Sequence, residues 1–172
     1  MGRALVHVVL RRRGVAARFV PPVSIVLAAR HTAYVEGLVA FREGHVAKWI
    51  ASFASAASRA ALMSIELADR VGALQGEWRE HAGRPRAGSA ASRLIALLPA
   101  LPVLSAPTAR AAIGVSQQQT FAALKALAGG GVVRQLSEGT HDRQYAATDL
   151  FDLLAAYEED VAGPARSAGS AR

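Results

Sequence analysis

Side chains suited to reading a nucleic acid gather in the second half of the chain. Residues 117–120 read Gln-Gln-Gln-Thr and begin an expected helix. The N-terminal end of such a helix is the end that enters a major groove, where a glutamine can pair with both hydrogen-bonding groups of an adenine edge. Cations nearby are expected to reach the backbone phosphates. The candidate DNA-binding residues are Arg110, Ser116, Gln117, Gln118, Gln119, Thr120, Lys125, Arg134, His141 and Arg143.

Residue types that support catalysis or metal binding form no motif in this sequence. The five histidines stand at no metal-ligand spacing, and the chain contains no cysteine. The glycines at 129–131 follow an expected helix rather than a strand, and no Lys-Ser/Thr follows them, so they indicate a helix stop rather than a phosphate loop. No Gly-x-Ser-x-Gly elbow occurs. We expect no catalytic residue and no metal site in this chain.

The elements that must position the candidate residues are two helices joined by a short turn. A short helix is expected over Thr108–Ile113, with Gly114 as its left-handed stop. Ser116 is placed to cap the next helix, Gln117–Ala128. We interpret the pattern as a helix-turn-helix. The buried face of its second helix is expected to carry Phe121, Leu124 and Leu127.

A β-hairpin is expected directly after the second helix. Val132–Leu136 predicts a strand, Glu138–Thr140 a turn, and Arg143–Ala146 the return strand. Thr148 then caps a final helix over Asp149 to about Asp160. A helix-turn-helix followed by a β-hairpin is a winged helix.

Charge is distributed unevenly along the chain. Residues 1–86 hold 13 basic and 6 acidic residues, a balance of +7, whereas residues 87–165 hold 5 and 7, a balance of −2. The affinity of proteins for DNA rests largely on cationic contacts with phosphates, so the negative balance argues against DNA binding. Two interpretations of the winged helix therefore stay open, namely DNA binding and the docking of a protein.

The first half of the chain is expected to be helical and to bury a core. Hydrophobic residues make up 52% of the 172 residues. The prolines at 21–22 mark the start of a helix that runs from Val23 to Leu38 or beyond. A long helix without proline is expected over Val46–His81. Residues 82–92 are rich in glycine, proline and small side chains and predict a linker, followed by a short helix at 90–98.

The sequence opens on an apolar segment with a basic end. Residues 2–14 read Gly-Arg-Ala-Leu-Val-His-Val-Val-Leu-Arg-Arg-Arg-Gly and predict a helix with a glycine stop. No Ser, Thr, Asp or Asn precedes the segment to cap it. A signal peptide is disfavoured, because three arginines stand where a small-residue cleavage site belongs. An ordinary core helix of an unrelated bundle stays open.

The same segment resembles the end of the active-site motif of Fic-family proteins. That motif runs His-x-Phe-x-Asp/Glu-Gly-Asn-Gly-Arg-x-x-Arg and leads into an apolar helix. Arg3 falls on its last Arg, and Gly2 on the variable position before it. Further along, Pro22-Val23-Ser24, Tyr34 and Trp49 match positions where the family has Pro-x-Ser, a Tyr and a Trp. The expected winged helix is similar to the one that trails the Fic domain in bacterial and archaeal members.

The resemblance implies a nucleotidyl-transfer ancestry. Fic enzymes move AMP from ATP to a protein hydroxyl, using the motif's His as general base and its acid to hold Mg²⁺. Gly2 and Arg3 would be a remnant of the nucleotide-phosphate site. The other motif residues would lie before Met1, so we expect a truncated Fic-family protein that does not transfer adenylyl groups. ATP and Mg belong to the intact family and are not expected as cofactors here. If the start site lies further upstream, the alternative is a full-length adenylyltransferase.

The predicted fold is mainly α, with the remnant of a Fic-type helical bundle followed by a winged helix-turn-helix that has a small β-hairpin. The partner could be DNA, a second copy of the chain, or another protein such as an intact Fic protein that this chain regulates. No apolar stretch has the length of a membrane span, so a cytoplasmic protein without membrane contact is expected. The expected domains are Fic-like helices at 1–84, a linker at 85–94, the winged helix at 95–160 and a disordered tail at 161–172.

Overall fold

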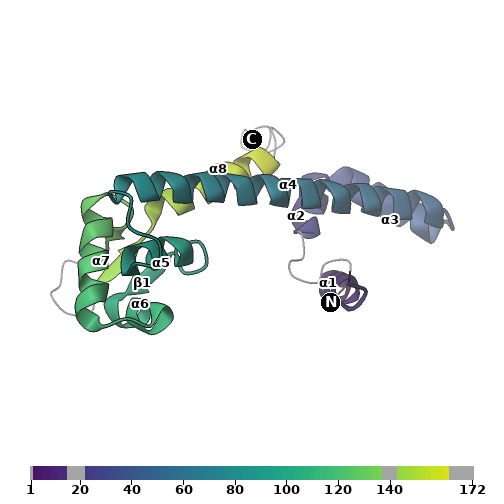
Figure 1. The fold of residues 1–172 in the computed structure, drawn as a ribbon. Helices are drawn as coiled ribbons and strands as arrows, with labels where there is room; N and C mark the ends of the chain where they lie inside the picture. Colours follow the sequence, from purple (N-terminus) through teal and green to yellow (C-terminus); the bar gives the residue numbers. More distant parts are fainter. Residues whose placement is uncertain (1, 15–21, 137–142, 163–172) are drawn as a thin grey trace. The chain divides into compact units, whose positions relative to one another are not determined.

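The fold is mainly helical with one small antiparallel sheet. The computed structural model describes residues 2–14, 22–136 and 143–162, with residues 2–4, 6, 7, 161 and 162 described as backbone only. Over these residues the chain forms eight helices and three strands (Figure 1). It divides into two compact units: unit 1 comprises residues 1–68 and 157–172, and unit 2 comprises residues 69–156.

Unit 1 contains helix α1 (Gly2–Arg12), α2 (Val23–Ala29), α3 (His31–Arg42) and the first part of α4 (Val46–His81). Its core is small, because alanines supply half of the buried positions. The side chains of α2 pack on α4 in a cluster of Val23, Val26, Ala56 and Ala60.

The second helix of the chain is shorter than expected. The pattern from Val23 to Leu38 predicts one helix, but the structure breaks it at Arg30, which has φ −110° and ψ 46°. The break lets α2 pack on α4 near Ala60 while Gly37 of α3 approaches the ring of Trp49. Neither glycine nor proline marks position 30, so the sequence carries no signal for this bend.

Among the described residues, only a bent pair of helices has the length and apolar composition of a membrane span. No single helix there is both long and apolar enough to cross a bilayer. The pair α2 and α3 meets the length and composition requirement only when taken together, and the two helices are bent by 99°.

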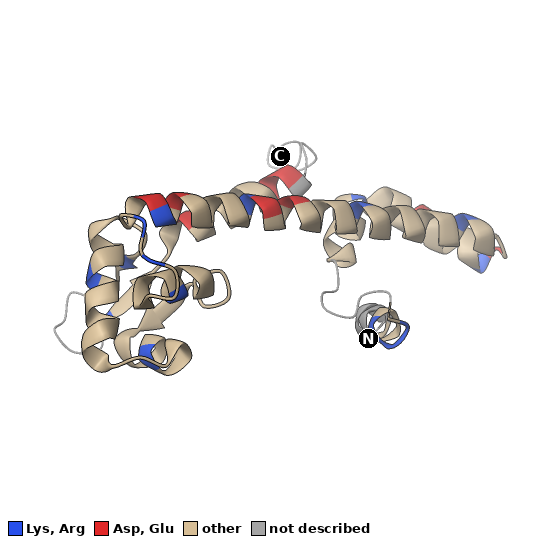
Figure 2. Cartoon of the chain, in the orientation of Figure 1, with Lys and Arg blue, Asp and Glu red and all other residues tan. Residues whose placement is uncertain are grey.

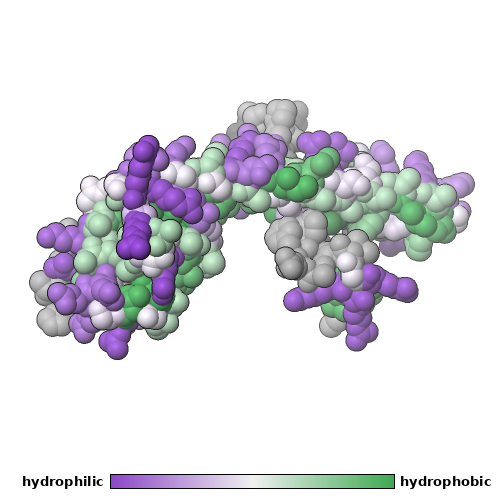
Figure 3. Space-filling model, in the orientation of Figure 1, coloured by the Kyte–Doolittle hydropathy of each residue, from purple (hydrophilic) through white to green (hydrophobic). Residues whose placement is uncertain are grey.

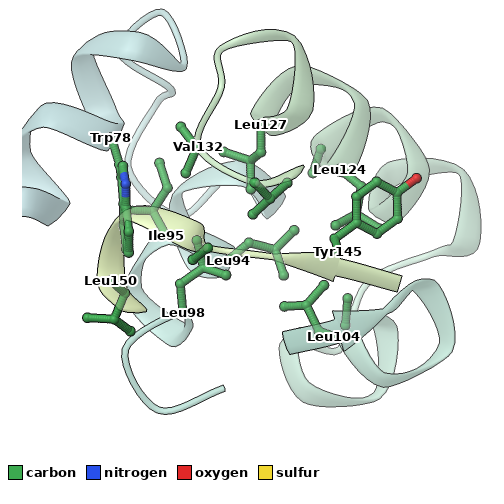
Figure 4. Close-up of a cluster of buried hydrophobic side chains, with 14 of the residues drawn as sticks. Trp78, Leu94, Ile95, Leu98, Leu104, Leu124, Leu127, Val132, Tyr145 and Leu150 are labelled. Carbon is green, nitrogen blue, oxygen red and sulfur yellow. The ribbon is translucent and has the colours of Figure 1, made fainter. Parts of the chain in front are cut away.

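Unit 2 has a larger and better packed core. It gathers the end of α4, helix α5 (Ala90–Leu97), helix α6 (Ala106–Ile113), helix α7 (Gln117–Gly129) and most of α8 (Thr148–Ala162). Large buried side chains from all of these elements meet in one cluster (Figure 4). Among them are Trp78, Leu94, Ile95, Leu98, Ile113, Leu124, Leu127 and Leu150.

A three-stranded antiparallel sheet completes unit 2. Its strands are β1 (Val103–Ser105), β2 (Arg134–Gln135) and β3 (Gln144–Ala146), in the spatial order β1-β3-β2. Strands β2 and β3 confirm the expected hairpin, although the paired region is shorter. Val132 and Val133 are buried in the core ahead of the paired residues. The expected hairpin turn, 138–140, lies outside the described residues.

Strand β1 is an element that the sequence pattern did not predict. Leu104 pairs with Tyr145 of β3 and is 2% exposed. The segment is only three residues long and follows Pro102, so it shows no alternating pattern to detect. The strand pairs a third segment with the hairpin and joins α5 to α6.

The division between the units lies within α4 rather than in the linker expected around residues 82–92. Unit 2 begins at Asp69. The reason is Trp78, which is fully buried in the unit 2 core and whose Nε1–H donates to the Asp149 carboxylate at 3.4 Å. The Gln75 amide also donates to the Ile95 carbonyl oxygen at 3.0 Å. The last turns of α4 are therefore part of the C-terminal fold.

Candidate nucleic-acid interface

Two helices joined by a three-residue turn form the centre of the candidate interface. Helix α6 is capped at its start by Ser105, whose hydroxyl accepts from the Thr108 N–H, and at its end by Gly114. Gly114 has φ 65° and ψ 39°, the left-handed conformation in which a Cβ is unfavourable. The expected glycine stop and the expected cap at Ser116 are both confirmed.

Three of the candidate residues hold the start of α7 in place. The Ser116 hydroxyl accepts from the Gln119 N–H at 3.3 Å, and the Gln119 amide oxygen accepts from the Ser116 N–H at 3.2 Å. This reciprocal pair is a capping box. Thr120 is 1% exposed, and its hydroxyl donates to the Ser116 carbonyl oxygen at 2.9 Å. These side chains are engaged in the fold and are poor candidates for contact with bases.

The exposed face of α7 differs from the one that the sequence predicted. Leu124 and Leu127 are buried as expected, but Phe121 is 47% exposed, and Thr120 takes the inward position instead. The reason is helical spacing: positions 120, 124 and 127 fall on one side of a helix, whereas position 121 is rotated by about 100° from 120. The outward side, which we call the α7 face, carries Gln117, Gln118, Phe121, Ala122 and Lys125.

Polar side chains at the start of the α7 face are available for a ligand. Gln117 and Gln118 are exposed, and their side chains have no hydrogen-bond partner within the described part of the chain. Glutamine is an amide with two donors and one acceptor oxygen. Two adjacent free amides at the N-terminal end of a helix can therefore pair with an external hydrogen-bonding edge.

A shallow groove separates the α7 face from α6. Its volume is about 160 Å³, and it is lined by Ala106, Pro107, Arg110, Gln117, Thr120 and Phe121. A second hollow, in unit 1 beside Tyr34, measures about 80 Å³. Sites that enclose a small molecule or cofactor hold about 300–1,000 Å³. Both hollows are too small for that role, and the α6–α7 groove is better suited to admit one edge of a larger ligand.

Two contacts fix α6 and α7 against the rest of unit 2. The Arg93 Nη1–H donates to the Ile113 carbonyl oxygen at 3.1 Å, at the last residue of α6, and its Nε–H donates to the Gly88 carbonyl oxygen at 3.0 Å. At the other end, Gly130 caps α7 directly against the backbone of His81, where a Cβ would overlap the carbonyl group.

The segment that contains the α7 face carries cations but no acidic residue. No Asp or Glu occurs in residues 81–137, which contain α5, β1, α6, α7 and β2 and carry six Lys or Arg. Figure 2 shows these elements with blue but no red residues. The balance of −2 for residues 87–165 comes from acids at 138, 142 and in α8. The sum over residues 87–165 therefore hides a segment that carries cations and no acid.

Four of the candidate phosphate contacts are exposed, and a fifth lies outside the described residues. Arg110 on α6, Lys125 on α7, Arg134 on β2 and Arg143 before β3 are all exposed. His141 lies outside the described part. The four exposed cations come from four different segments of unit 2, and exposed cations are the side chains that contact phosphates.

The N-terminal candidates are described only in part. Gly2 and Arg3 lie at the start of α1, and the helix itself is confirmed over Gly2–Arg12. The side chain of Arg3 is outside the description. Within the described ranges, no three His, Asp or Glu side chains come close enough to hold a metal ion.

Comparison with known proteins assigns no family to the chain. No protein-family model and no curated protein matches its sequence.

Proposed function

We propose that unit 2 is a winged helix-turn-helix module that binds double-stranded DNA, with the α7 face in the major groove. The observation that carries the proposal is the combination of an acid-free segment at 81–137 with two free glutamine amides at the start of α7. The element order supports it, because a helix, a three-residue turn, a second helix and a β-hairpin follow one another from Ala106 to Ala146.

The dimensions of α7 suit this role. Its 13 residues span about 20 Å at 1.5 Å per residue, and the major groove is about 12 Å wide and admits one helix. The N-terminal turn, which carries the free amides, also has the positive end of the helix dipole. This favours its approach to the phosphate-lined groove.

The proposal is tested by fluorescence anisotropy of a labelled 20-base-pair duplex with the full chain over a series of salt concentrations. Each phosphate contact changes the slope of log K against log salt by about 0.9. We expect Arg110→Gln and Lys125→Gln each to weaken binding and to flatten the slope by about that amount. Arg59→Gln is the matched control, because Arg59 is an exposed arginine of unit 1. No wild-type binding at low salt, or equal slopes for all variants, would overturn the proposal.

A second candidate function, self-association, is favoured by the surface of unit 1. Large apolar side chains are exposed on α4, including Ile50 at 59%, Leu62 at 68% and Ile65 at 61%. Figure 3 shows hydrophobic side chains at the surface along α4. Apolar side chains that gather on a surface can serve as a protein-interaction site, and dimeric DNA-binding modules pair with two-fold sites. We propose that a second copy of the chain covers it.

Self-association is tested by light scattering coupled to size exclusion. We expect the full chain to elute with twice its mass of 18.0 kDa, and Leu62→Glu or Ile65→Glu to shift it toward the monomer. A wild-type monomer at every concentration would rule out this candidate while leaving the DNA proposal intact.

The relation to Fic proteins also stays a proposal. It is supported by the residues at 2–14 and by the helix that they form, because the Fic motif also leads into an apolar helix. The 172 residues do not contain the His-x-Phe-x-Asp/Glu-Gly-Asn-Gly segment. We therefore expect no transfer of label from α-labelled ATP with Mg²⁺ to protein acceptors. Transfer dependent on this chain would contradict that expectation.

A further inference from the structure

The centre of the α7 face is apolar, although it lies between polar groups. Phe121 is 47% exposed, and Ala122 beside it is exposed as well. They follow the glutamines by one helical turn and precede Lys125 by another. These two side chains offer an apolar contact at the centre of an otherwise polar face.

The major groove of DNA offers one apolar feature, the C5 methyl group of thymine. Phenylalanine and alanine are among the side chains that contact it. The amide of glutamine pairs with the N6 and N7 positions of adenine, the partner of thymine. The two kinds of side chain on the α7 face thus match the two bases of the same pair.

The α7 face also lacks what recognition of G·C pairs requires. Guanine is read by Arg or Lys, and cytosine by Glu or Asp. The first two turns of the exposed face carry neither a cation nor an acid, and Lys125 stands at the C-terminal end of the face, away from the groove-entering end. Arg110 lies across the groove on α6, where it suits a phosphate rather than a base.

We infer that the α7 face selects A·T pairs, with Phe121 as the residue that contacts thymine methyl groups and Gln117 and Gln118 as the residues that read adenine. This inference rests on the proposed DNA binding and adds the class of site that is bound. Phe121 is exposed on this face, and Thr120 supplies the inward contact in its place.

The test compares thymine with uracil, which differs only by the missing methyl group. Anisotropy is measured for the full chain on a 20-base-pair duplex of A·T pairs, on the same duplex with uracil in place of thymine, and on a G·C duplex. A buried methyl-sized group is worth about 0.8 kcal/mol, or about a fourfold change in affinity. We expect wild-type binding to weaken about fourfold or more with uracil and to be weakest on G·C.

Variants separate the methyl contact from a general effect of the duplex. Phe121→Ala should bind the thymine and uracil duplexes equally well. Phe151→Ala is the matched control, because Phe151 is also an exposed phenylalanine of unit 2, 42% exposed on α8, and it should keep the wild-type discrimination.

Failure of this inference is distinct from failure of the proposed function. If wild-type protein binds duplexes but does not distinguish thymine from uracil, or if Phe121→Ala discriminates as wild type does, the methyl contact is wrong and DNA binding stands. If the G·C duplex binds as tightly as the A·T duplex, the A·T preference is wrong. If no duplex binds at low salt, the proposed function falls and this inference with it.

Discussion

Identical residue types serve different purposes within a single turn of α7. Gln117 and Gln118 present free side chains, whereas the amide of Gln119 closes the capping box with Ser116. The spacing Ser-x-x-Gln is a capping signature that is legible in the sequence. The burial of Thr120 is harder to predict. Either Thr120 or Phe121 could face the core, and the larger apolar side chain, Phe121, is the one that the sequence pattern favours.

Substitution at the cap separates stability from binding. We expect Ser116→Ala to lower the free energy of unfolding by about 1 kcal/mol, because the Gln119 N–H loses its acceptor. Gln117→Ala should leave stability within about 0.5 kcal/mol, since its side chain is exposed, and should weaken DNA binding. Urea unfolding and anisotropy measure the two effects. Equal stability losses in both variants would contradict the assignment.

Position 130 requires glycine because the backbone of His81 lies too close to leave room for a Cβ. A Cβ there would overlap the His81 carbonyl group, and its distance to the carbonyl carbon would be 2.9 Å. We expect Gly130→Ala to cost about 1–3 kcal/mol of stability, as overpacking does. The neighbouring Gly129 meets no atom within 4 Å, so Gly129→Ala should be neutral or stabilising. A denaturant series that ranks the two variants in the opposite order would show that α7 does not pack on α4 in this way.

At the scale of elements, the helices were largely predictable and the sheet was only partly so. Helix α4 has the predicted bounds, and α5, α6, α7 and α8 differ from prediction by two residues or fewer at each end where bounds were given. Caps and stops such as Ser89 and Gly114 carry local signals that determine helix ends. Strand β1 depends on pairing with β3, which is a contact between segments far apart in sequence and leaves no local pattern.

The position of α6 depends on a side chain from α5. Arg93 donates to the carbonyl groups of Ile113 and Gly88. We expect Arg93→Gln to lower the free energy of unfolding by about 0.5–1.5 kcal/mol per lost hydrogen bond. Arg86→Gln is the control, because Arg86 is exposed and its side chain has no partner in the described ranges. The contribution of Arg93 is refuted if thermal unfolding of the two variants is indistinguishable.

At the scale of the molecule, each unit contains one tryptophan. Trp78 is fully buried in unit 2, and Trp49 is partly buried in unit 1, beside Tyr34 and Phe53. We expect Trp49→Phe protein, which retains Trp78, to emit at a shorter wavelength than Trp78→Phe protein. Trp78→Phe should also lower the stability of unit 2, because it leaves a void and removes the donor to Asp149. Emission maxima that are equal, or in the reverse order, would contradict the burial of Trp78.

The net charge of the whole chain is informative only when it is counted segment by segment. The formal charge of +7 and the balance of −2 over residues 87–165 both average over surfaces of different sign. The acids of α8 and the cations of α5 to β2 belong to different segments of the chain, and a sum over residues 87–165 adds them together. The candidate interface and its acid-free segment could therefore be located in the sequence, but the outward residues of α7 could not.

The most direct test of DNA binding through the α7 face is a two-dimensional amide NMR titration of the full chain with duplex DNA at low salt. Our account predicts that the largest shift changes fall on Gln117, Gln118, Phe121, Ala122 and Lys125. The amides of the exposed, acidic side of α8 should change least. Changes centred on α8 or on unit 1, or no changes at any DNA concentration, would contradict it.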